Sequence, residues 1–581
     1  MTPILNLFYN LLSKLILSVF TFILICRFGS AQNIESIGKK DPLKITGGIS
    51  TSNVVYTASG IESRRDPYNY FFSGNLNFSL YGWNVPLSFT FSNQNSAFQQ
   101  PFNQYGLHPT YKSVTGHLGY VSMSFSPYTL SGHLFQGVGV DIAPKGKFKY
   151  SAMYGRLQKA VEPDTLSEQT ITPYFKRMGY GMKVSYVDGA DFASLIVFGA
   201  KDDINSISYV PADEGVLPEE NLVLSVSAGK SLFERLVIDA EFATSAITRD
   251  LTAQEVSLDR TTAFKYAGGL FTPRTSSNYY SALKSGLTYK ANAYSIGLGY
   301  ERIDPGYRTL GAYYFNSDLE NITVNAATAF FNGKVSLAVN VGKQRDNLDN
   351  TKISTLQRWV SSTNVAYAAS PKLNLAGSYS NFQTFTNIRS QFLDVNQLTP
   401  YDNLDTLNFT QISQNANLNV AYILSSNKNK RQNINANLSF QNAADEQGGV
   451  EQNSGSQFYS ANTSYSLSLV PRNTTITVAF NYNKNEAGEI NSATFGPTLA
   501  VSKTYFEKKL RTTFSSSMND SYSNSIRLNR VMNYRLNGSY SMKKKHNLNL
   551  SMITVNRNTN TESAATDFTE LTTTFGYSYN F

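Results

Sequence analysis

The sequence predicts an all-β fold, a transmembrane antiparallel β-barrel of about 26 strands, within a range of roughly 24 to 28. Apolar and polar residues alternate along most of the chain after Lys44, as in strands with two unlike faces. The connections between these segments are alternately short and long, and a secretion signal opens the chain. No window repeats apolar residues at helical spacing. We therefore assign residues 44–581 to the barrel.

The N-terminus has the features of a signal peptide. Residues 15–25 form an apolar run that is too short to cross a bilayer as a helix. Gly29 and Ala31 occupy the small-residue positions of a cleavage site. We expect residues 1–31 to be removed, which leaves residues 32–43 as a short periplasmic segment before the barrel.

The single cysteine, Cys26, lies inside this signal. Its removal would leave a mature chain without disulfide or thiol chemistry. Lipid attachment at Cys26 is the alternative, and it is disfavoured because the bulky Ile25 precedes the cysteine.

The composition favours a water-filled interior over a soluble surface. Only 16% of residues are charged, the net charge is +9, and Tyr and Phe reach 37 each. Asn, Ser and Thr fill most polar positions, whereas a soluble sheet would carry more Lys and Glu. Aromatic residues gather near strand ends, as at residues 313–315, where interfacial girdles would lie. With so mild a charge we expect no nucleic-acid partner.

One hairpin shows the alternation clearly. Leu76, Phe78 and Leu80 share one face of a segment whose other face is polar. After a turn at Gly82, residues 85–91 repeat the pattern. The pair therefore indicates two antiparallel strands with an apolar face and a polar face.

Connection length indicates which end of the barrel faces outward. Short connections include residues 370–372 and 543–546, and long ones include 202–220 and 384–406. Short periplasmic turns and long extracellular loops are usual in outer-membrane barrels. Acidic residues gather in the long loops and basic ones in the short turns, which ordinary solvation explains. A divalent-ion contact to lipopolysaccharide is the alternative, and we expect outer-membrane lipid and lipopolysaccharide as partners.

Counting strands from the two ends of the chain gives a conflict. Residues 93–114 and 202–220 would both lie outside only if one strand between His117 and Arg156 is miscounted. We place the doubt at residues 126–133, which would then form a bend instead of a tight turn.

Arginines on one late strand are candidates for lumen selectivity. Arg527 and Arg535 fall on its polar face, where they would bias the pore toward anions unless neighbouring strands pair with them. Arg530 falls on the apolar face, so we expect it near an interface or at a bulge.

Residues 93–114 are the candidate constriction. The segment is rich in amide and aromatic residues and has almost no charge. Long loops in compact proteins are usually functional, and a wide barrel needs narrowing to keep the membrane a barrier. We expect the segment to fold into the lumen, with an ordinary surface loop as the alternative. Its lumen residues would be Gln99, Phe102, Tyr105 and Tyr111.

Enzymatic chemistry finds little support. His117 and His133 flank several serines, so a Ser–His hydrolase can be imagined, but no motif accompanies them. Gly137 and Gly139 lack a following helix for a nucleotide site, and the acidic segment after Asp346 lacks EF-hand spacing. We predict that the protein is not an enzyme and holds no cofactor or metal.

The final segment resembles the C-terminal assembly signal of outer-membrane barrel proteins. Phe575, Tyr577, Tyr579 and Phe581 share one face of it. The resemblance implies recognition by the barrel-assembly machinery and a place in the outer membrane of a Gram-negative cell. Residues 99–112 and 126–133 resemble a pattern found in uncharacterised large barrels of the Bacteroidota. This likeness implies no chemistry.

These observations predict an outer-membrane β-barrel channel or transporter that passes unidentified solutes passively through an aqueous lumen. The alternative is a structural or assembly barrel that anchors a surface protein or serves a secretion or adhesion complex.

Overall fold

The computed structural model describes residues 43–581 apart from 81, 94–102, 164–172, 213–214, 258–263, 265–268, 352–356, 382–413, 444–445, 448–449, 452–455, 544 and 560–566. The expected signal peptide and nearly all of the expected periplasmic segment lie outside the described residues. Among the residues described, no helix is both long and apolar enough to cross a membrane.

Strands make up most of the described chain, and all but two of them form one wall. The wall strands are β1 (Lys44–Ser59), β2 (Tyr68–Leu80), β3 (Trp83–Ser92), β4 (Gln104–Leu107), β5 (Thr110–Tyr111), β6 (Val114–Ser124), β7 (Ser131–Ile142), β8 (Phe148–Gln158), β9 (Lys176–Asp188), β10 (Asp191–Asp203), β11 (Glu220–Leu232), β12 (Leu236–Thr248), β13 (Ser277–Lys290), β14 (Tyr294–Ile303), β15 (Leu319–Phe330), β16 (Val335–Arg345), β17 (Gln357–Ser370), β18 (Leu373–Ser380), β19 (Gln414–Ser426), β20 (Lys430–Ala443), β23 (Ser456–Leu469), β24 (Thr474–Ala487), β25 (Ile490–Tyr505), β26 (Leu510–Ser523), β27 (Ile526–Met542), β28 (His546–Thr559) and β29 (Phe568–Asn580). A separate small hairpin consists of β21 (Glu446–Gln447) and β22 (Val450–Glu451).

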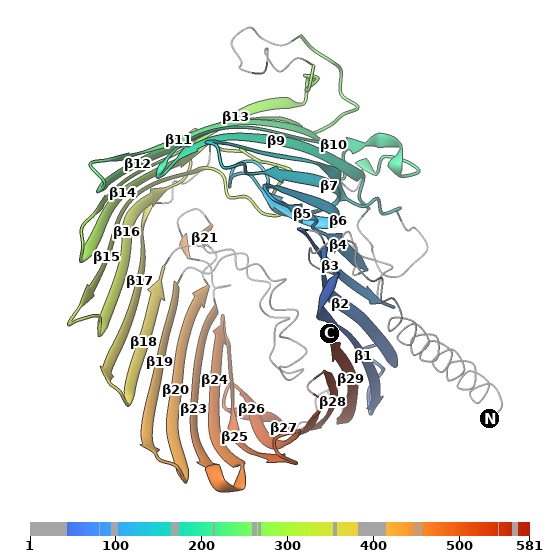
Figure 1. Ribbon diagram of the computed structural model, residues 1–581, viewed down its shortest axis with the longest axis vertical. Coiled ribbons are helices and arrows are strands. Elements are labelled where there is room, and N and C mark those ends of the chain that lie inside the picture. Colours follow the sequence, from blue (N-terminus) through green and yellow to red (C-terminus); the bar gives the residue numbers. More distant parts are fainter. Residues whose placement is uncertain are drawn as a thin grey trace, which may run out of the picture.

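The wall closes into a ring. Consecutive strands pair antiparallel, and β29 pairs with β1 from Asn580 opposite Gly48 to Thr569 opposite Ser59. Figure 1 shows β29 beside β1 where the ring closes. The sheet has 27 assigned strands, but β4 and β5 share one position between β3 and β6. The fold is thus a closed antiparallel barrel of 26 strands, which confirms the predicted fold class.

β4 and β5 are one strand that is interrupted at Pro109. Their pairs with β6 keep a single register, with Leu107 opposite Leu118 and Thr110 opposite Thr115. Proline has no backbone N–H to donate to the ladder, so regular pairing stops there without any change of direction.

The strand missing from the count made on the sequence is residues 104–111. The expected miscount between His117 and Arg156 is therefore wrong, and residues 93–114 are not one long loop. Residues 125–130 form a short connection at the long-loop end, between β6 and β7. With an even number of strands, the start of β1 and the end of β29 both lie at the short-turn end.

Side chains alternate between an outward row and an inward row. Large exposed apolar side chains share the outward row, as in the cross-strand pairs Val138–Tyr154 and Leu287–Leu298. Leu195, in the same row, is 61% exposed. So extensive an apolar surface suits surrounding hydrocarbon better than water. The inward row is mostly polar, and it lines the lumen.

One long connection covers part of the outer face near the long-loop end. Within residues 249–276, between β12 and β13, Phe264 and Phe271 pack on Leu222 and Ala246 of the wall. Leu222 and Ala246 are fully buried as a result. This connection therefore covers these apolar strand ends with protein.

The topology predicts which side chains an impermeant reagent reaches on intact cells. Ser63, between β1 and β2, and Glu507, between β25 and β26, are both exposed and lie at opposite ends of the barrel. In a chain that has lost Cys26, Ser63→Cys should react with an impermeant maleimide on whole cells, and Glu507→Cys only after lysis. Labelling of Glu507→Cys in intact cells would show that the topology is inverted.

Candidate functional site: the barrel lumen

The inward row from β15 to β26 is rich in amides. Asn437 donates to Asn417 at 3.2 Å, and Asn481 donates to Thr498 at 3.3 Å. Equivalent cross-strand amide contacts join Asn340 to Asn325 and Asn462 to Asn481. Among the residues described in these strands, the inward row contains no Asp or Glu. Arg511, near the short-turn end of β26, is a charged member of the row and donates to Ser502 at 3.3 Å. The rest of the sector offers mostly uncharged hydrogen-bonding groups.

The inward row from β6 to β14 has a different character. Acidic and basic side chains face the lumen there, and they alternate with apolar side chains that are buried inside the barrel. The charged members include Asp141, Lys183, Glu241, Lys284 and Glu301. The lumen is therefore lined by two unlike sectors.

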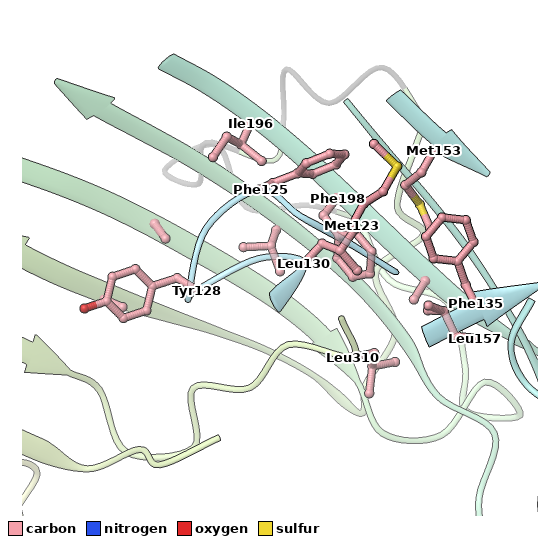
Figure 2. Packing of buried hydrophobic residues seen from close by; sticks show 14 of the residues in the cluster. Met123, Phe125, Tyr128, Leu130, Phe135, Met153, Leu157, Ile196, Phe198 and Leu310 are labelled. Atoms are coloured by element: carbon pink, nitrogen blue, oxygen red, sulfur yellow. The ribbon is translucent and has the colours of Figure 1, made fainter. Parts of the chain in front are cut away.

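Two connections fold inward onto this second sector. One is residues 125–130, and the other is residues 304–318 between β14 and β15, which we call the inner strap. Figure 2 shows Phe125, Leu130 and Phe198 packed together, with Leu310 of the strap nearby. The buried cluster consists of Val121, Met123, Phe125, Tyr128, Leu130, Phe135, Met153, Leu157, Ile196, Phe198, Ala200, Val223, Ala243, Ala282, Ile303, Tyr307 and Leu310. An apolar core thus lies inside an otherwise polar lumen.

A row of glycines makes room for this core. The row runs across five neighbouring positions of the inner wall, which are Gly106, Gly119, Gly137, Gly155 and Gly179. A Cβ on Gly155 would lie 2.7 Å from the Phe135 ring, and one on Gly179 would lie 2.6 Å from Leu157. Both distances are far below ordinary contact, so the core packs directly on the backbone of the wall.

Hydrogen bonds fasten the inner strap across the lumen. The Tyr307 hydroxyl donates to the Tyr128 carbonyl at 2.9 Å, although 179 residues separate the two. The Ser131 N–H donates to the Gly311 carbonyl at 2.9 Å, and the Leu310 N–H donates to the Asn221 side chain at 3.1 Å. The strap therefore joins β14 to the connection between β6 and β7 and rests on β11 between them.

The two buried tyrosines remain protonated donors. Burial raises the pKa of Tyr307, and burial together with the nearby Glu301 carboxylate raises the pKa of Tyr128. The Tyr128 hydroxyl donates to Glu301 at 2.6 Å. Neither hydroxyl loses its proton at physiological pH, so the bonds that hold the strap persist.

An ion network clamps the strap at the long-loop end. Arg177 contacts Asp202 at 2.7 Å and Glu219 at 2.9 Å, and Arg308 of the strap contacts Glu219 at 2.7 Å. The Arg177 side chain is 13% exposed and Asp202 is more deeply buried. Charges so buried persist only when they are paired, so the network fixes the end of the strap against the wall.

A cavity of about 740 Å³ opens beside the strap at the same end. Its lining includes Arg177 and Arg308 of the network and the aromatic residues Tyr313 and His133. The Tyr313 and His133 rings stack with their centroids 4.0 Å apart. Residues 313–315, expected in an interfacial girdle, therefore belong to the interior, and that expectation was wrong.

The arginines predicted to set selectivity lie on different rows. Arg535 stands in the inward row, opposite Ser515 and Ile553. A register shift near Tyr522 places Arg527 opposite that tyrosine, on the outward side. The sequence could not show the shift, so the lumen position expected for Arg527 does not hold.

Arg530 lies on the outward row beside that shift, as expected for an arginine at a bulge. Its guanidinium donates to both oxygens of Asp520, at 2.7 and 2.8 Å. Asp520 therefore neutralises the Arg530 charge, and the sequence alone did not identify this partner.

The expected constriction does not hold for its two described residues. Tyr105 and Tyr111 lie on the outward row of β4 and β5, in the wall. Tyr105 packs edge-on against Tyr120, and Tyr111 stacks on Trp83 at 4.9 Å. The inward closure is made by residues 125–130 and the inner strap instead. Gln99 and Phe102 lie outside the described residues.

The histidines do not assemble the imagined hydrolase site. His117 contacts His108 and Asp141, whereas His133 contacts the Leu134 carbonyl. Within the part of the chain that the structure describes, no group of three or more His, Cys, Asp or Glu residues is arranged to hold a metal ion.

The residues of the expected assembly signal share one face of β29. Phe575, Tyr577 and Tyr579 occupy its outward row, and the Phe581 N–H donates to the Gly47 carbonyl at 2.9 Å. Their recognition by an assembly machinery stays a prediction.

The glycine row makes a stability prediction. Gly155→Ala should lower the free energy of unfolding by about 1–3 kcal/mol, because the added methyl group meets the Phe135 ring and nearby backbone. Gly538→Ala is the matched control, since a Cβ there meets nothing within 4 Å. Urea titration of the folded barrel in detergent measures both variants. Equal losses would contradict the packing described here.

Comparisons with known proteins identify no family. No family model matches the chain, and no curated protein matches it. Among solved structures, the P pilus usher (PapC) translocation pore is 9% identical with a TM-score of 0.38, covering 93% of this chain and 100% of that one. The FrpB iron transporter from Neisseria meningitidis (F5-1 variant) is 9% identical with a TM-score of 0.36, covering 92% and 82%. Acinetobacter baumannii OccAB2 is 9% identical with a TM-score of 0.27, covering 63% and 93%.

Proposed function

We propose that this protein is a passive outer-membrane channel whose lumen is narrowed on one side by the inner strap. The observation that carries the proposal is the polar inward row of a closed barrel whose outward row is apolar. Barrels with fewer strands, in the range of about 16 to 18, already leave an aqueous channel. A ring of 26 strands has room for both a solute path and an internal core.

The unlike sectors of the lumen suggest where solutes pass. The strap and its core occupy the side lined by β6 to β14, so the path lies along the amide wall of β15 to β26. Amide and hydroxyl groups exchange hydrogen bonds with hydrated solutes and select weakly by charge. We expect small uncharged hydrophilic solutes to pass. The inward arginines Arg511 and Arg535 border a sector whose described inward row has no Asp or Glu, so they add a preference for anions among charged solutes.

The surroundings of the barrel support an outer-membrane location. Exposed aromatic residues sit at the tips of three short turns, which are Phe233, Phe331 and Phe506. Aromatic side chains favour the membrane interface, and the apolar outward row would face the lipid between the two interfaces. Lipopolysaccharide, the barrel-assembly machinery and a surface or secretion partner are proposed contacts. A barrel that serves such a partner without conducting is the alternative function.

Loosening the strap should enlarge the pore. Arg308→Ala removes the ion pair with Glu219, worth about 1 kcal/mol for a partly exposed pair, and leaves Arg177 paired. In planar bilayers the variant should show larger openings up to about fivefold more often than the natural protein. Arg472→Ala, on an exposed short turn at the opposite end, is the control.

The same recordings decide between the two functions. If the natural protein conducts steadily and Arg308→Ala shows the same conductance, the strap does not narrow the pore and that part of the proposal is wrong. A folded barrel that conducts nothing in either form would favour the structural or assembly role.

A further inference from the structure

Two histidines face each other on the inner wall, away from the strap. His108 lies where β4 and β5 meet, and its place in the register is directly opposite His117 of β6, between the pairs Leu107–Leu118 and Thr110–Thr115. Their Nδ1 atoms are 2.9 Å apart, and the ring planes meet at 75°. The two rings therefore share one proton between nitrogens on adjacent strands.

A carboxylate determines which nitrogen of His117 stays free. The Nε2 atom of His117 lies 2.8 Å from Asp141, and a carboxylate accepts, so Nε2 carries the proton. Ser151 donates to the other Asp141 oxygen and holds the carboxylate in place. Nδ1 of His117 thus presents its lone pair to His108. Orientation of an imidazole by a second-shell carboxylate is characteristic of metal-binding histidines.

We propose that His108 and His117 form a chelating site for a divalent transition metal, with Cu²⁺ and Ni²⁺ preferred. On binding, the His108 proton moves from Nδ1 to Nε2, so no net proton is lost, and the two rings turn until both Nδ1 lone pairs face the ion. Water supplies the remaining ligands. The His117 side chain is 13% exposed and Asp141 is 44% exposed, so both water and ions reach the pair from the lumen.

The hydrogen-bonded spacing of the two nitrogens is already close to the spacing in a right-angled chelate. At metal–nitrogen distances of about 2.0–2.1 Å, donors 2.9 Å apart subtend an angle of about 90° at the metal. A tetrahedral ion such as Zn²⁺ would need the nitrogens about 3.3–3.4 Å apart. A right angle suits the tetragonal geometry of Cu²⁺ and Ni²⁺, and Cu²⁺ also binds nitrogen ligands most strongly among these ions.

The position gives the site a structural consequence. Pro109 leaves one donor missing from the wall beside His108, and Pro86 leaves another in β3. A metal held by both histidines would link the interrupted strand of β4 and β5 to β6 at this weak point. The inference is independent of the proposed channel function, because it requires only the folded barrel.

Metal titration of the refolded mature chain in detergent tests the site. Cu²⁺ and Ni²⁺ should each bind with one ion per chain by calorimetry, produce a visible absorption band, and raise the midpoint of thermal unfolding. Asp141→Asn should weaken binding about 10- to 100-fold, since it removes the group that orients His117.

Histidine variants distinguish this pair from the rest of the chain. His108→Gln and His117→Gln should each abolish the one-to-one binding. His546→Gln should retain it, because His546 lies on the outward row and bonds to Tyr577. Gel mobility before and after heating checks that each variant is folded. If one of the two glutamine variants does not fold, the other one alone is enough for the test.

Two results would overturn the inference. One is a folded His108→Gln or His117→Gln barrel that binds Cu²⁺ as the natural chain does. The other is a natural chain that binds none at one-to-one stoichiometry, which would leave the histidines as a simple hydrogen-bonded pair.

Discussion

Pairing of β29 with β1 is the interaction on which the rest of this structure depends. It removes the two free edges that a 26-strand sheet would otherwise expose, and in an apolar environment each unpaired backbone group costs several kcal/mol. Closure also requires an even number of antiparallel strands, which places both ends of the wall at the short-turn end. Once the ring is closed, one row of every strand faces outward and the other faces the lumen.

The lumen that results is asymmetric, and the asymmetry follows from side-chain volume. Glycines such as Gly155 and Gly179 leave the wall of one sector flat enough for an apolar core to pack against backbone. That core, with the ion network around Arg177, holds the inner strap across the lumen. The opposite sector is rich in amides, and those amides bond to one another and to hydroxyl groups along the wall. One barrel thus combines an internal core with a polar face.

The alternation of residues such as Leu76 and Phe78 was enough to predict the fold class and the strand number, because a period of two is local. Three features were not local. The strand at residues 104–111 was missed because Pro109 interrupts its ladder. The strap was missed because Tyr307 finds its partner 179 residues away. Arg527 was misplaced because a register shift changes the row without any mark in the sequence.

Disulfide trapping across the seam tests closure most directly. Ser50 of β1 lies opposite Ser578 of β29, and Thr574 lies four positions before Ser578 on the same strand. In the mature chain, mild oxidation of the Ser50→Cys/Ser578→Cys variant should yield an intramolecular cross-link in membranes. The Ser50→Cys/Thr574→Cys variant should yield little. Equal cross-linking of both pairs, or of neither, would contradict the closed ring and its register.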